Sequence, residues 1–192
     1  EPAGYEDMIV ELLDIVDENG MPTGEQTDRA KAHELGIRHR TSHVWILRFR
    51  DGKLQVLLQK RSSRKDSYPG CYDISSAGHI PAGVDFIPSA LRELEEELGL
   101  KLKEEDLFCC GQRAFSFERE FHGKTFRDNQ ISNVYCVWLD LEEDDFLLQE
   151  EEVEEVRWFD FKECLKMVRE QTVPNCIYEE ELKLLYQGAM RS

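Results

Sequence analysis

Residues 78–100 read "GHIPAGVDFIPSALRELEEELGL", and this stretch holds the most informative pattern of the chain. At about 100° of rotation per residue, Glu93, Glu96 and Glu97 share one arc of a helix that is roughly 100° wide. Four hydrophobic side chains form a stripe on a different face of the same helix: Ile87, Leu91, Leu94 and Leu98. Such a stripe would pack against a sheet. The sequence therefore predicts a helix that is anchored by its apolar face and presents its acidic face.

The ends of this helix can be placed from three residues. Asp85 suits the N-cap position, because its carboxylate can accept a hydrogen bond from a free N–H of the first turn. Pro88 falls in that first turn, where a missing N–H breaks no helical hydrogen bond. Gly99 can adopt the left-handed conformation that ends many helices. We therefore expect the helix to run between Asp85 and Gly99.

The clustered carboxylates should repel one another, by roughly a few tenths of a kcal/mol per pair at helical spacing. A hard divalent cation such as Mg²⁺ would offset this repulsion, since it takes oxygen ligands and shares its shell with substrate phosphates. A solvated acidic face is the alternative, because the chain carries 40 acidic and 24 basic residues. The spacing alone leaves both interpretations open.

The whole stretch resembles the Nudix box, G-x5-E-x7-R-E-U-x-E-E-x-G-U, in which U is an aliphatic residue. Gly78 matches the first glycine, residues 92–94 match R-E-U, and residues 96–97 and 99–100 match the remaining fixed letters. One fixed position departs, because Val84 stands where the family has its first glutamate. A match of this length and spacing is far more specific than a short glycine motif.

This resemblance implies a fold and a reaction. The expected fold is α/β, an α/β/α sandwich in which the box helix and the C-terminal helices pack on a mixed β-sheet. Residues 151–161, "EEVEEVRWFDF", are similar to a late strand common in Nudix domains. In Nudix enzymes one to three Mg²⁺ or Mn²⁺ ions are held against a diphosphate, and water attacks a phosphorus atom.

The match also assigns roles residue by residue. It implies that Glu96 and Glu97 are metal ligands, and that Glu93 is a further ligand or the general base. The carbonyl of Gly78 would add a ligand, and Arg92 would orient the acids rather than react. The cation would then explain why like charges are gathered on one side of the helix.

The departure at Val84 affects the expected partner of the box arginine. In the family the glutamate at this position typically pairs with that arginine, so this chain leaves Arg92 without one partner. The metal ligands themselves are intact. We therefore predict weakened positioning rather than lost chemistry.

Residues 58–79 resemble more narrowly the branch of the superfamily that includes type I isopentenyl diphosphate isomerase. Arg61 and Lys65 fall where that enzyme holds the substrate diphosphate. Its metal-binding histidines correspond to three residues here, the last at a spacing one residue short: His39, His79 and His33. Imidazole is a reasonable metal ligand. The alternative is that these histidines are hydrogen-bonded structural residues.

Two differences argue against isomerisation. The isomerase protonates and deprotonates an alkene with a cysteine in a C-G-H triplet and with a downstream acidic pair. In this chain the triplet is Ala77-Gly78-His79, and the acids correspond to Asp128 and Gln130. Because general acid–base chemistry needs a titratable group at the reacting carbon, hydrolysis is favoured.

Residues 60–65 are a basic stretch in an acidic chain, with four of six residues Lys or Arg. Arginine offers phosphate a bidentate fork and lysine offers a point charge. We therefore expect Arg61, Arg64 and Lys65 to bind the diphosphate, and a solvated turn is the alternative. The acidic run 141–155 is typical of a solvated face, although one of its glutamates could supply another metal ligand.

The composition of the chain limits its possible partners and its location in the cell. The net charge of −16 disfavours nucleic acid and anionic membranes as partners, and no apolar run approaches the roughly 18 residues of a bilayer span. The start of the chain lacks the pattern of a signal peptide.

The six cysteines show no metal-ligand spacing and are interpreted as reduced thiols. Cys136 is expected in a strand core, and Cys109 and Cys110 are expected on opposite faces of a strand. We therefore expect a cytoplasmic protein.

We expect a single domain over residues 1–192, since no linker or repeat divides the chain. Residues 1–38 would form an N-terminal extension with a hairpin turning at Asn19-Gly20, and residues 39–165 would form the core. Two hairpins are expected within the core, with turns at Asp51-Gly52 and near His122-Gly123. Helices are expected at 162–169 and 178–190, and residues 166–192 are assigned to a C-terminal helical part that follows the core. The hydrophobic strands and these helices are compatible with a homodimer.

The sequence thus favours a Mg²⁺- or Mn²⁺-dependent hydrolase that cleaves a diphosphate linkage in a small nucleoside diphosphate-type compound. Isopentenyl diphosphate isomerase-like activity and a non-catalytic binding module stay open as alternatives. The aromatic side chains of Phe115, Phe117, Trp45 and Trp158 are interpreted as core rather than as a stacking platform.

Overall fold

The computed structural model describes residues 11–192. Its strands are β1 (Leu12–Val16), β2 (Pro22–Asp28), β3 (His39–Arg50), β4 (Lys53–Arg61), β5 (Tyr72–Asp73), β6 (Ser76–His79), β7 (Phe108–Phe121), β8 (Lys124–Trp138) and β9 (Val153–Asp160). Its α-helices are α1 (Arg29–Leu35), α2 (Phe86–Leu98), α3 (Phe161–Glu170) and α4 (Glu179–Ala189). Two short 3₁₀ helices span Glu104–Asp106 and Glu143–Asp145.

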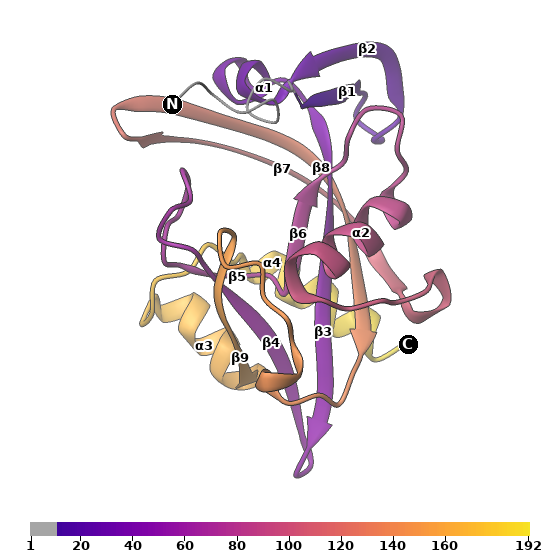
Figure 1. The fold of residues 1–192 in the computed structure, drawn as a ribbon, viewed down its shortest axis with the longest axis vertical. Coiled ribbons are helices and arrows are strands. Elements are labelled where there is room, and N and C mark those ends of the chain that lie inside the picture. Colours follow the sequence, from indigo (N-terminus) through magenta and orange to yellow (C-terminus); the bar gives the residue numbers. More distant parts are fainter. Residues whose placement is uncertain (1–10) are drawn as a thin grey trace.

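Seven strands form one mixed sheet, in which β5-β4-β3-β8-β7 are hydrogen-bonded in that order (Figure 1). Strand β6 pairs with β3, and β9 pairs with β4. Only the β3–β8 pair is parallel among these described strands; the others are antiparallel. The expected turns at Asp51-Gly52 and His122-Gly123 are confirmed, and all four residues have positive φ.

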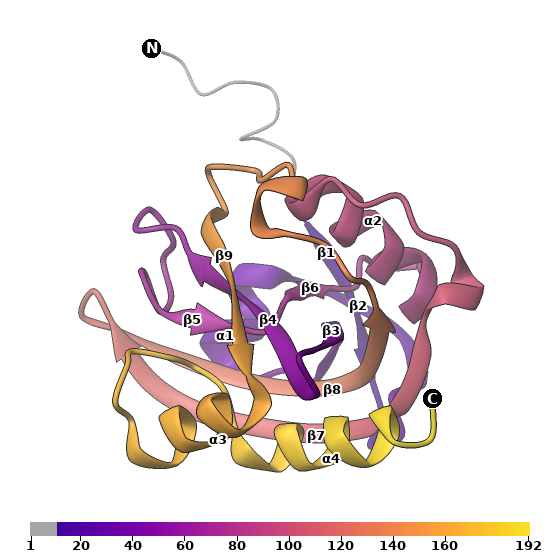
Figure 2. The ribbon, with the colours of Figure 1, turned by 90° about the horizontal axis from the view of Figure 1, so that it is seen from below.

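Helices cover both faces of the sheet, because its central strands are hydrophobic on both sides. On β3, Trp45 and Leu47 belong to a core that includes residues of α3 and α4. Their neighbours Val44 and Ile46 belong to a second core that includes residues of α2. Figure 2 shows α2 on one side of the sheet and α3 with α4 on the other. The expected α/β/α sandwich is confirmed.

The N-terminal part contains the expected hairpin and one unexpected helix. Strands β1 and β2 pair antiparallel, and Gly20 in their turn has a φ of 80°. Helix α1 follows directly and was not predicted, because seven residues are too few to show a helical period. Asp28 caps it by accepting a hydrogen bond of 2.7 Å from the backbone N–H of Lys31. This helix brings His33 to the sheet.

Helix α2 begins and ends where the sequence predicts. Gly99 ends it with a φ of 70°. Asp85 occupies the N-cap position, but its side chain makes no capping hydrogen bond, so the predicted role of its carboxylate is wrong. The hydrophobic stripe is only partly buried, since Ile87 and Leu91 keep some exposure while Leu94 and Leu98 are fully buried.

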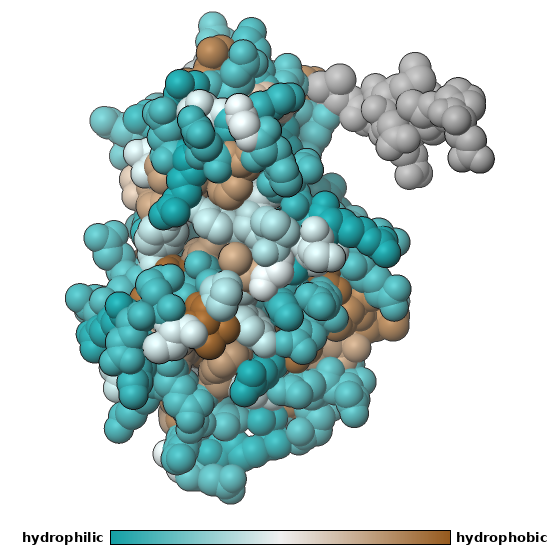
Figure 3. Space-filling view, turned by 90° about the vertical axis from the view of Figure 1, so that its left-hand side faces the viewer, coloured by the Kyte–Doolittle hydropathy of each residue, from teal (hydrophilic) through white to brown (hydrophobic). Residues whose placement is uncertain are grey.

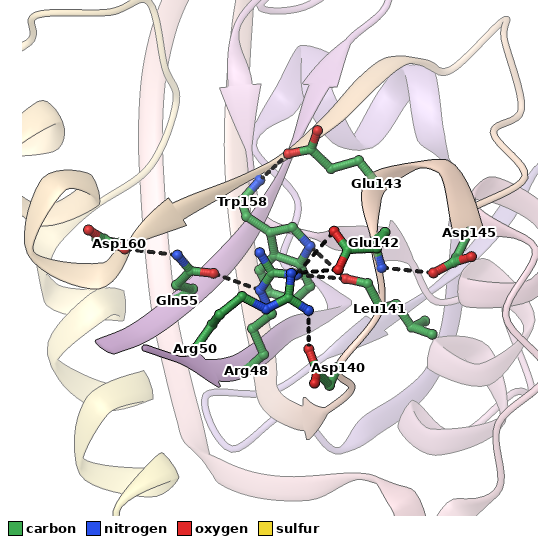
Figure 4. A network of polar contacts seen from close by, with 10 residues as sticks. All are labelled: Arg48, Arg50, Gln55, Asp140, Leu141, Glu142, Glu143, Asp145, Trp158 and Asp160. Atoms are coloured by element: carbon green, nitrogen blue, oxygen red, sulfur yellow. Dashed lines mark hydrogen bonds and ion pairs between the residues drawn. The ribbon is translucent and has the colours of Figure 1, made fainter. Parts of the chain in front are cut away.

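A polar network fixes the segment after β8 to the β3–β4 hairpin (Figure 4). The guanidinium of Arg48 lies 4.2 Å from the ring centroid of Trp158 and donates to the carbonyl of Leu141 at 2.9 Å. Gln55 accepts a second hydrogen bond from Arg48, and Arg50 pairs with Asp140 at 2.7 Å. The segment that begins at Asp140 contacts helix α2 at residue 149. Fixing its start to the hairpin therefore also helps to position residues 149–152.

Three further predictions can be compared with the structure. All six cysteines are free thiols. Cys136 is fully buried, and Cys109 is exposed while Cys110 is buried, as expected. Within residues 11–192, the helices are too short or too polar to cross a bilayer. The predicted extent of the single domain includes residues 1–10, which lie outside the described residues, and it stays a prediction.

Candidate active site

One cavity of about 340 Å³ collects most of the predicted site residues. Helix α2, strands β3 and β6, the β7–β8 hairpin, the loop after β4 and the residues before α4 all contribute to its wall. The face drawn in Figure 3 is mostly hydrophilic, with hydrophobic side chains reaching the surface near its middle. Seven of the predicted residues line the cavity: Gly78, His79, Glu93, Glu96, Glu97, Arg61 and Lys65.

Arg64 and Arg92 do not line this cavity. Both are exposed, so the substrate-binding role predicted for Arg64 gains no support. Nε of Arg92 lies 3.8 Å from Oε1 of Glu96, and both side chains are about half exposed (48% and 54%). An exposed pair at this distance restrains little. The effect of Val84 on Arg92 stays a prediction.

The box carboxylates are held in a partly buried arrangement. Glu97 is buried, and Nε2 of Gln59 donates to its Oε2 at 3.3 Å. Burial, together with the neighbouring charge of Glu93, raises the pKa of Glu97 to about 8. Burial and the charge of Glu96 also raise the pKa of Glu93. Two carboxyl groups whose anionic forms are disfavoured fit a divalent cation, which would favour both anions.

Gly78 on β6 makes room for Glu93. A Cβ atom at this position would lie 2.8 Å from Cδ of Glu93, which is closer than side chains tolerate. The carboxylate of Glu93 therefore lies against the backbone of the first residue of the box. This contact places the backbone of Gly78 beside the acidic cluster.

A fourth carboxylate reaches the cavity from the acidic run before β9. Glu152 lines the cavity and forms an ion pair with Lys65 of the basic loop. The backbone N–H of Gln149 donates to the carbonyl of Glu97 at 3.0 Å, which fixes this segment to the end of α2. The acidic run alone could not single out Glu152, because its selection depends on where the chain passes the box helix.

The basic loop is braced by its own residues. Nη1 of Arg61 lies 3.2 Å from Oδ2 of Asp73, and its Nε donates to the carbonyl of Ser67 at 3.0 Å. Arg61 and Lys65 both line the cavity, and their charges are partly balanced by Asp73 and Glu152. A diphosphate would compete for these cations with the two carboxylates.

Three histidines meet beside the acidic cluster. His33 from α1, His39 from β3 and His79 from β6 place ring nitrogens within 4.8 Å of one another. Oδ1 of Asp128 on β8 lies 3.5 Å from Nε2 of His39 and 3.7 Å from Nε2 of His33. Burial and the neighbouring His39 lower the pKa of His33 to about 3. Burial and the charge of Arg29 also lower the pKa of His79. Lowered pKa values favour the neutral imidazole, the form that binds metals.

The contacts around this histidine cluster fit a cation. Nδ1 of His39 lies 2.9 Å from the carbonyl of Ile37, which orients its Nε2 inward. Nε2 of His39 and Oδ1 of Asp128 are buried and have no hydrogen-bond partner among residues 11–192. Nε2 atoms of His33 and His79 lie 3.3 Å apart. Three imidazoles and a carboxylate form a donor set suited to Zn²⁺ or Mn²⁺.

The far wall of the cavity is aromatic. Phe115, Phe117 and Phe126 of the β7–β8 hairpin line it together with Tyr68 and Tyr178. The ring centroids of Phe115 and Tyr178 lie 4.4 Å apart, and those of Phe115 and Phe117 lie 5.5 Å apart. Phe115 and Phe117 are only partly buried, so interpreting them as core was wrong. Their alternation along β7 was a signal for one shared face.

Trp45 and Trp158 are buried in the two cores, as the sequence predicts. The cavity floor beside Trp45 also contains a buried charged pair. Nδ1 of His43 lies 2.8 Å from Oε1 of Glu181, and Nε1 of Trp45 donates to Oε2 of Glu181 at 2.9 Å. The sequence offered no sign of this pair, because its members are 138 residues apart.

A family model described as NUDIX domain matches residues 38–176, which contain the box helix and the carboxylates around it. The chain belongs to the NUDIX domain family. The matched NUDIX region includes strands β3 to β9, so both metal-binding candidates lie within it except for His33 on α1.

Two relatives of this NUDIX domain are similar over most of the chain. "Nudix hydrolase 3" of Arabidopsis thaliana is 43% identical over 161 residues, which are 81% of this chain and 20% of that protein. A Nudix hydrolase of Clostridium acetobutylicum is 37% identical over 144 residues, which are 74% of this chain and 66% of that protein. The chain thus spans about a fifth of the length of the plant relative.

Solved structures show the same fold at low sequence identity. A Deinococcus radiodurans protein superimposes with a TM-score of 0.67 at 19% identity, covering 92% of this chain and 99% of that one. The NUDIX domain of Shewanella oneidensis NrtR, solved with ADP ribose, has a TM-score of 0.56 at 17% identity, covering 79% and 86%. A Caenorhabditis elegans Ap4A hydrolase has a TM-score of 0.52 at 20% identity, covering 79% and 96%.

Proposed function

We propose that this NUDIX domain hydrolyses a diphosphate linkage in a small nucleoside diphosphate-type compound with the help of Mg²⁺ or Mn²⁺. One observation carries the proposal: Glu93, Glu96, Glu97 and Glu152 line the same cavity as Arg61 and Lys65. Carboxylates that would bind a divalent cation and cations that would bind phosphate are what this reaction needs. The family and the curated names of its relatives support it.

Each residue has a distinct role in this proposal. Glu96 and Glu97 hold the cation, which when bound supplies charge stabilisation at phosphate and lowers the pKa of water. Glu93, placed by Gly78, is a further ligand or accepts the proton of the attacking water. Arg61 and Lys65 bind the diphosphate oxygens, and Lys65 exchanges its contact with Glu152 for phosphate. Glu152 then becomes available as an additional ligand.

The histidine cluster is proposed as a second cation site, formed by His33, His39, His79 and Asp128. The buried atoms without partners support this proposal. The same cluster is the observation that favours an isomerase-like reaction as the second candidate. Ala77 and Gln130 count against isomerisation, since neither side chain titrates where that chemistry would need an acid or base.

The test of hydrolysis is ³¹P NMR of the protein with Mg²⁺ and a panel of phosphate compounds. The panel contains nucleoside di- and triphosphates, nucleotide sugars, dinucleoside polyphosphates and isopentenyl diphosphate. We expect new monophosphate signals that are lost in Glu97→Gln and kept in Glu95→Gln, whose exposed side chain lies on the same helix outside the cavity. An unchanged panel would favour a binding module. A shifted double bond in the proton spectrum would favour isomerisation.

The second cation site is tested by metal stoichiometry. We expect dialysed protein loaded with Mn²⁺ or Zn²⁺ to lose one tightly bound ion in His39→Ala and to keep it in Glu97→Gln. His122→Ala is the matched control, because His122 lies in the β7–β8 turn outside the cluster. Equal metal content in His39→Ala and His122→Ala would refute the second site.

A further inference from the structure

Arg113 on β7 is a largely buried cation whose Nε finds no hydrogen-bond partner in the part of the chain that the structure describes. Its side chain is 10% exposed and lines the cavity. Among residues 11–192, its Nε has no hydrogen-bond partner, and its terminal nitrogens come no closer than 3.6 Å to Glu181 and 3.7 Å to Glu180. A guanidinium carries five N–H donors, and a buried one without an acceptor, such as Nε here, is costly. The structure thus holds a donor group for which a ligand would be the natural partner.

Glu181 forms no hydrogen bond with Arg113, because its Oε1 lies 3.6 Å from Nη1, and both oxygens of Glu181 are held by other donors. His43 occupies Oε1 at 2.8 Å, and Trp45 donates to Oε2 at 2.9 Å. Glu180 is 86% exposed and is a weak, solvated partner. The neighbouring carboxylates thus balance the charge of Arg113 without taking its hydrogen bonds.

Two aromatic rings lie beside the guanidinium of Arg113. Its guanidinium carbon lies 4.5 Å from the ring centroid of Phe115 and 5.1 Å from that of Tyr178. Residues 113, 115 and 117 share one face of β7, and Gln130 lies directly opposite Phe115 on β8. Nε2 of Gln130 donates to Oγ of Ser132 at 3.1 Å, which leaves its Oε1 to accept a hydrogen bond.

This aromatic end is separated from the box by the width of the sheet. Pairing runs from β6 to β3, from β3 to β8 and from β8 to β7, so His79, Thr41, Ser132 and Arg113 lie in one row. Three interstrand spacings amount to about 14 Å. A substrate whose diphosphate lies at the box must therefore carry a spacer to reach Arg113.

We propose that Arg113, with Gln130 and the rings of Phe115 and Tyr178, binds a planar heteroaromatic group of the substrate that carries a hydrogen-bond acceptor, such as a nucleobase. This inference rests on the proposed hydrolysis at the box and names the group at the other end of the same cavity. A planar group can stack on the rings while its acceptor atom accepts hydrogen bonds from the N–H groups of Arg113. A hydrocarbon chain would bury Arg113 without supplying a hydrogen-bond acceptor. The site therefore discriminates against alkyl and prenyl diphosphates.

The experiment compares two substrate types in matched variants. Wild type, Arg113→Gln, Arg113→Lys and Arg157→Gln are assayed with Mg²⁺ on ADP, GDP and UDP and on butyl diphosphate. Arg157 is an exposed arginine of β9 outside the cavity and serves as the control. We expect Arg113→Gln to raise KM for the nucleoside diphosphates at least about tenfold with little change in kcat, while Arg113→Lys falls between. Hydrolysis of butyl diphosphate should stay within about twofold of wild type.

Binding provides a second readout that does not depend on turnover. Calorimetry with the α,β-methylene analogues of the three nucleoside diphosphates should show Kd at least about tenfold weaker in Arg113→Gln and unchanged in Arg157→Gln. If no probe is hydrolysed and this difference in Kd persists, hydrolysis fails and the role of Arg113 stands. If KM and Kd match those of Arg157→Gln, or if wild type prefers butyl diphosphate, the role of Arg113 is refuted. An equal loss on both substrate types would also refute it.

Discussion

His43 on β3 and Glu181 on α4 form a buried ion pair, with Nδ1 of His43 2.8 Å from Oε1 of Glu181. Burial lowers the pKa of His43, but the charge and hydrogen bond of Glu181 outweigh this effect, so its pKa is raised. Burial raises the pKa of Glu181, but His43 and Arg113 outweigh this effect, so its pKa is lowered. Each partner therefore favours the charged form of the other. The pair ties the last helix to the strand that forms the cavity floor.

The pair predicts a pH-dependent stability. Its contribution from His43 is present below pH 6.5 and is lost as the pH rises through the raised pKa of the folded state. Its contribution from Glu181 is present above pH 4.5 and is lost as the pH falls through the lowered pKa. Glu181→Gln should cost about 3–5 kcal/mol of unfolding free energy between these values, because it leaves a buried charge unpaired. Urea denaturation at pH 5.5 and pH 8.5 measures the difference.

The control for this prediction is Glu180→Gln, one residue earlier on α4 and 86% exposed. It should change the unfolding free energy by less than about 0.5 kcal/mol. If Glu181→Gln were as stable as Glu180→Gln at pH 5.5, or if the gap widened toward pH 8.5, the charged pair would be refuted.

Glu95 and Glu97 lie two residues apart on the box helix, and we expect their substitutions to affect activity very differently. Glu97 is buried at the cavity, whereas Glu95 is exposed and only 3.9 Å from Nζ of the exposed Lys101. Glu97→Gln should lower kcat/KM at least about 100-fold, because a metal-binding carboxylate becomes a neutral amide. Glu95→Gln should change kcat/KM by less than twofold. Steady-state kinetics at saturating Mg²⁺ distinguishes them, and similar losses in both variants would contradict the assignment.

The raised pKa of Glu97 predicts that protons compete with the cation. Burial and Glu93 raise its pKa to about 8, so the carboxyl group is largely protonated at pH 6.5 before a cation binds. A cation must displace that proton, and its apparent affinity should rise about tenfold per pH unit until pH 8. Calorimetric titration of the metal-free protein with Mn²⁺ at pH 6.5, 7.5 and 8.5 measures this trend. A constant Kd over this range would show that Glu97 does not bind the ion.

The exposed position of Arg92 leads to a gain-of-function prediction. Its contact in the structure is a 3.8 Å approach to Glu96, which is itself proposed as a metal ligand. Val84→Glu supplies the carboxylate that the family typically has, which should release Glu96 and raise turnover about two- to fivefold. Val84→Gln serves as the uncharged control. Unchanged turnover and metal affinity in Val84→Glu would show that the pairing does not matter here.

Sequence reasoning succeeded where the signal was local. The box helix and its end at Gly99 follow from a 23-residue pattern, and the turns at Asp51-Gly52 and His122-Gly123 follow from residues that accept positive φ. The burial of β3 on both faces agrees with its continuous hydrophobic run, residues 44–47. These features depend on neighbours in the chain, so the sequence contains enough information to place them.

Reasoning from sequence failed where the site depends on distant segments. Glu152 could not be selected from its acidic run, because only the path after β8 brings it to α2. Asp128 meets His33 and His39 because β8 runs parallel to β3, and α1 was too short to predict. Phe115 looked like core because its hydrophobicity alone does not show that one side of β7 faces a cavity.

The contact between Gly78 and Glu93 makes the final prediction. Gly78 is absent from the glycines with positive φ, so alanine is compatible with its backbone. Its new Cβ would lie 2.8 Å from Cδ of Glu93 and would displace that carboxylate. Gly78→Ala should therefore lower kcat/KM about tenfold or more while the melting temperature changes little.

A double-mutant cycle tests whether this effect acts through Glu93. In a Glu93→Ala background the side chain that clashes is gone, so adding Gly78→Ala should cost no further activity. Thermal unfolding of all four proteins shows whether each variant is folded. If the two substitutions lower kcat/KM by independent factors, Gly78 acts through something other than the position of Glu93, and its place in the box would need a different physical explanation.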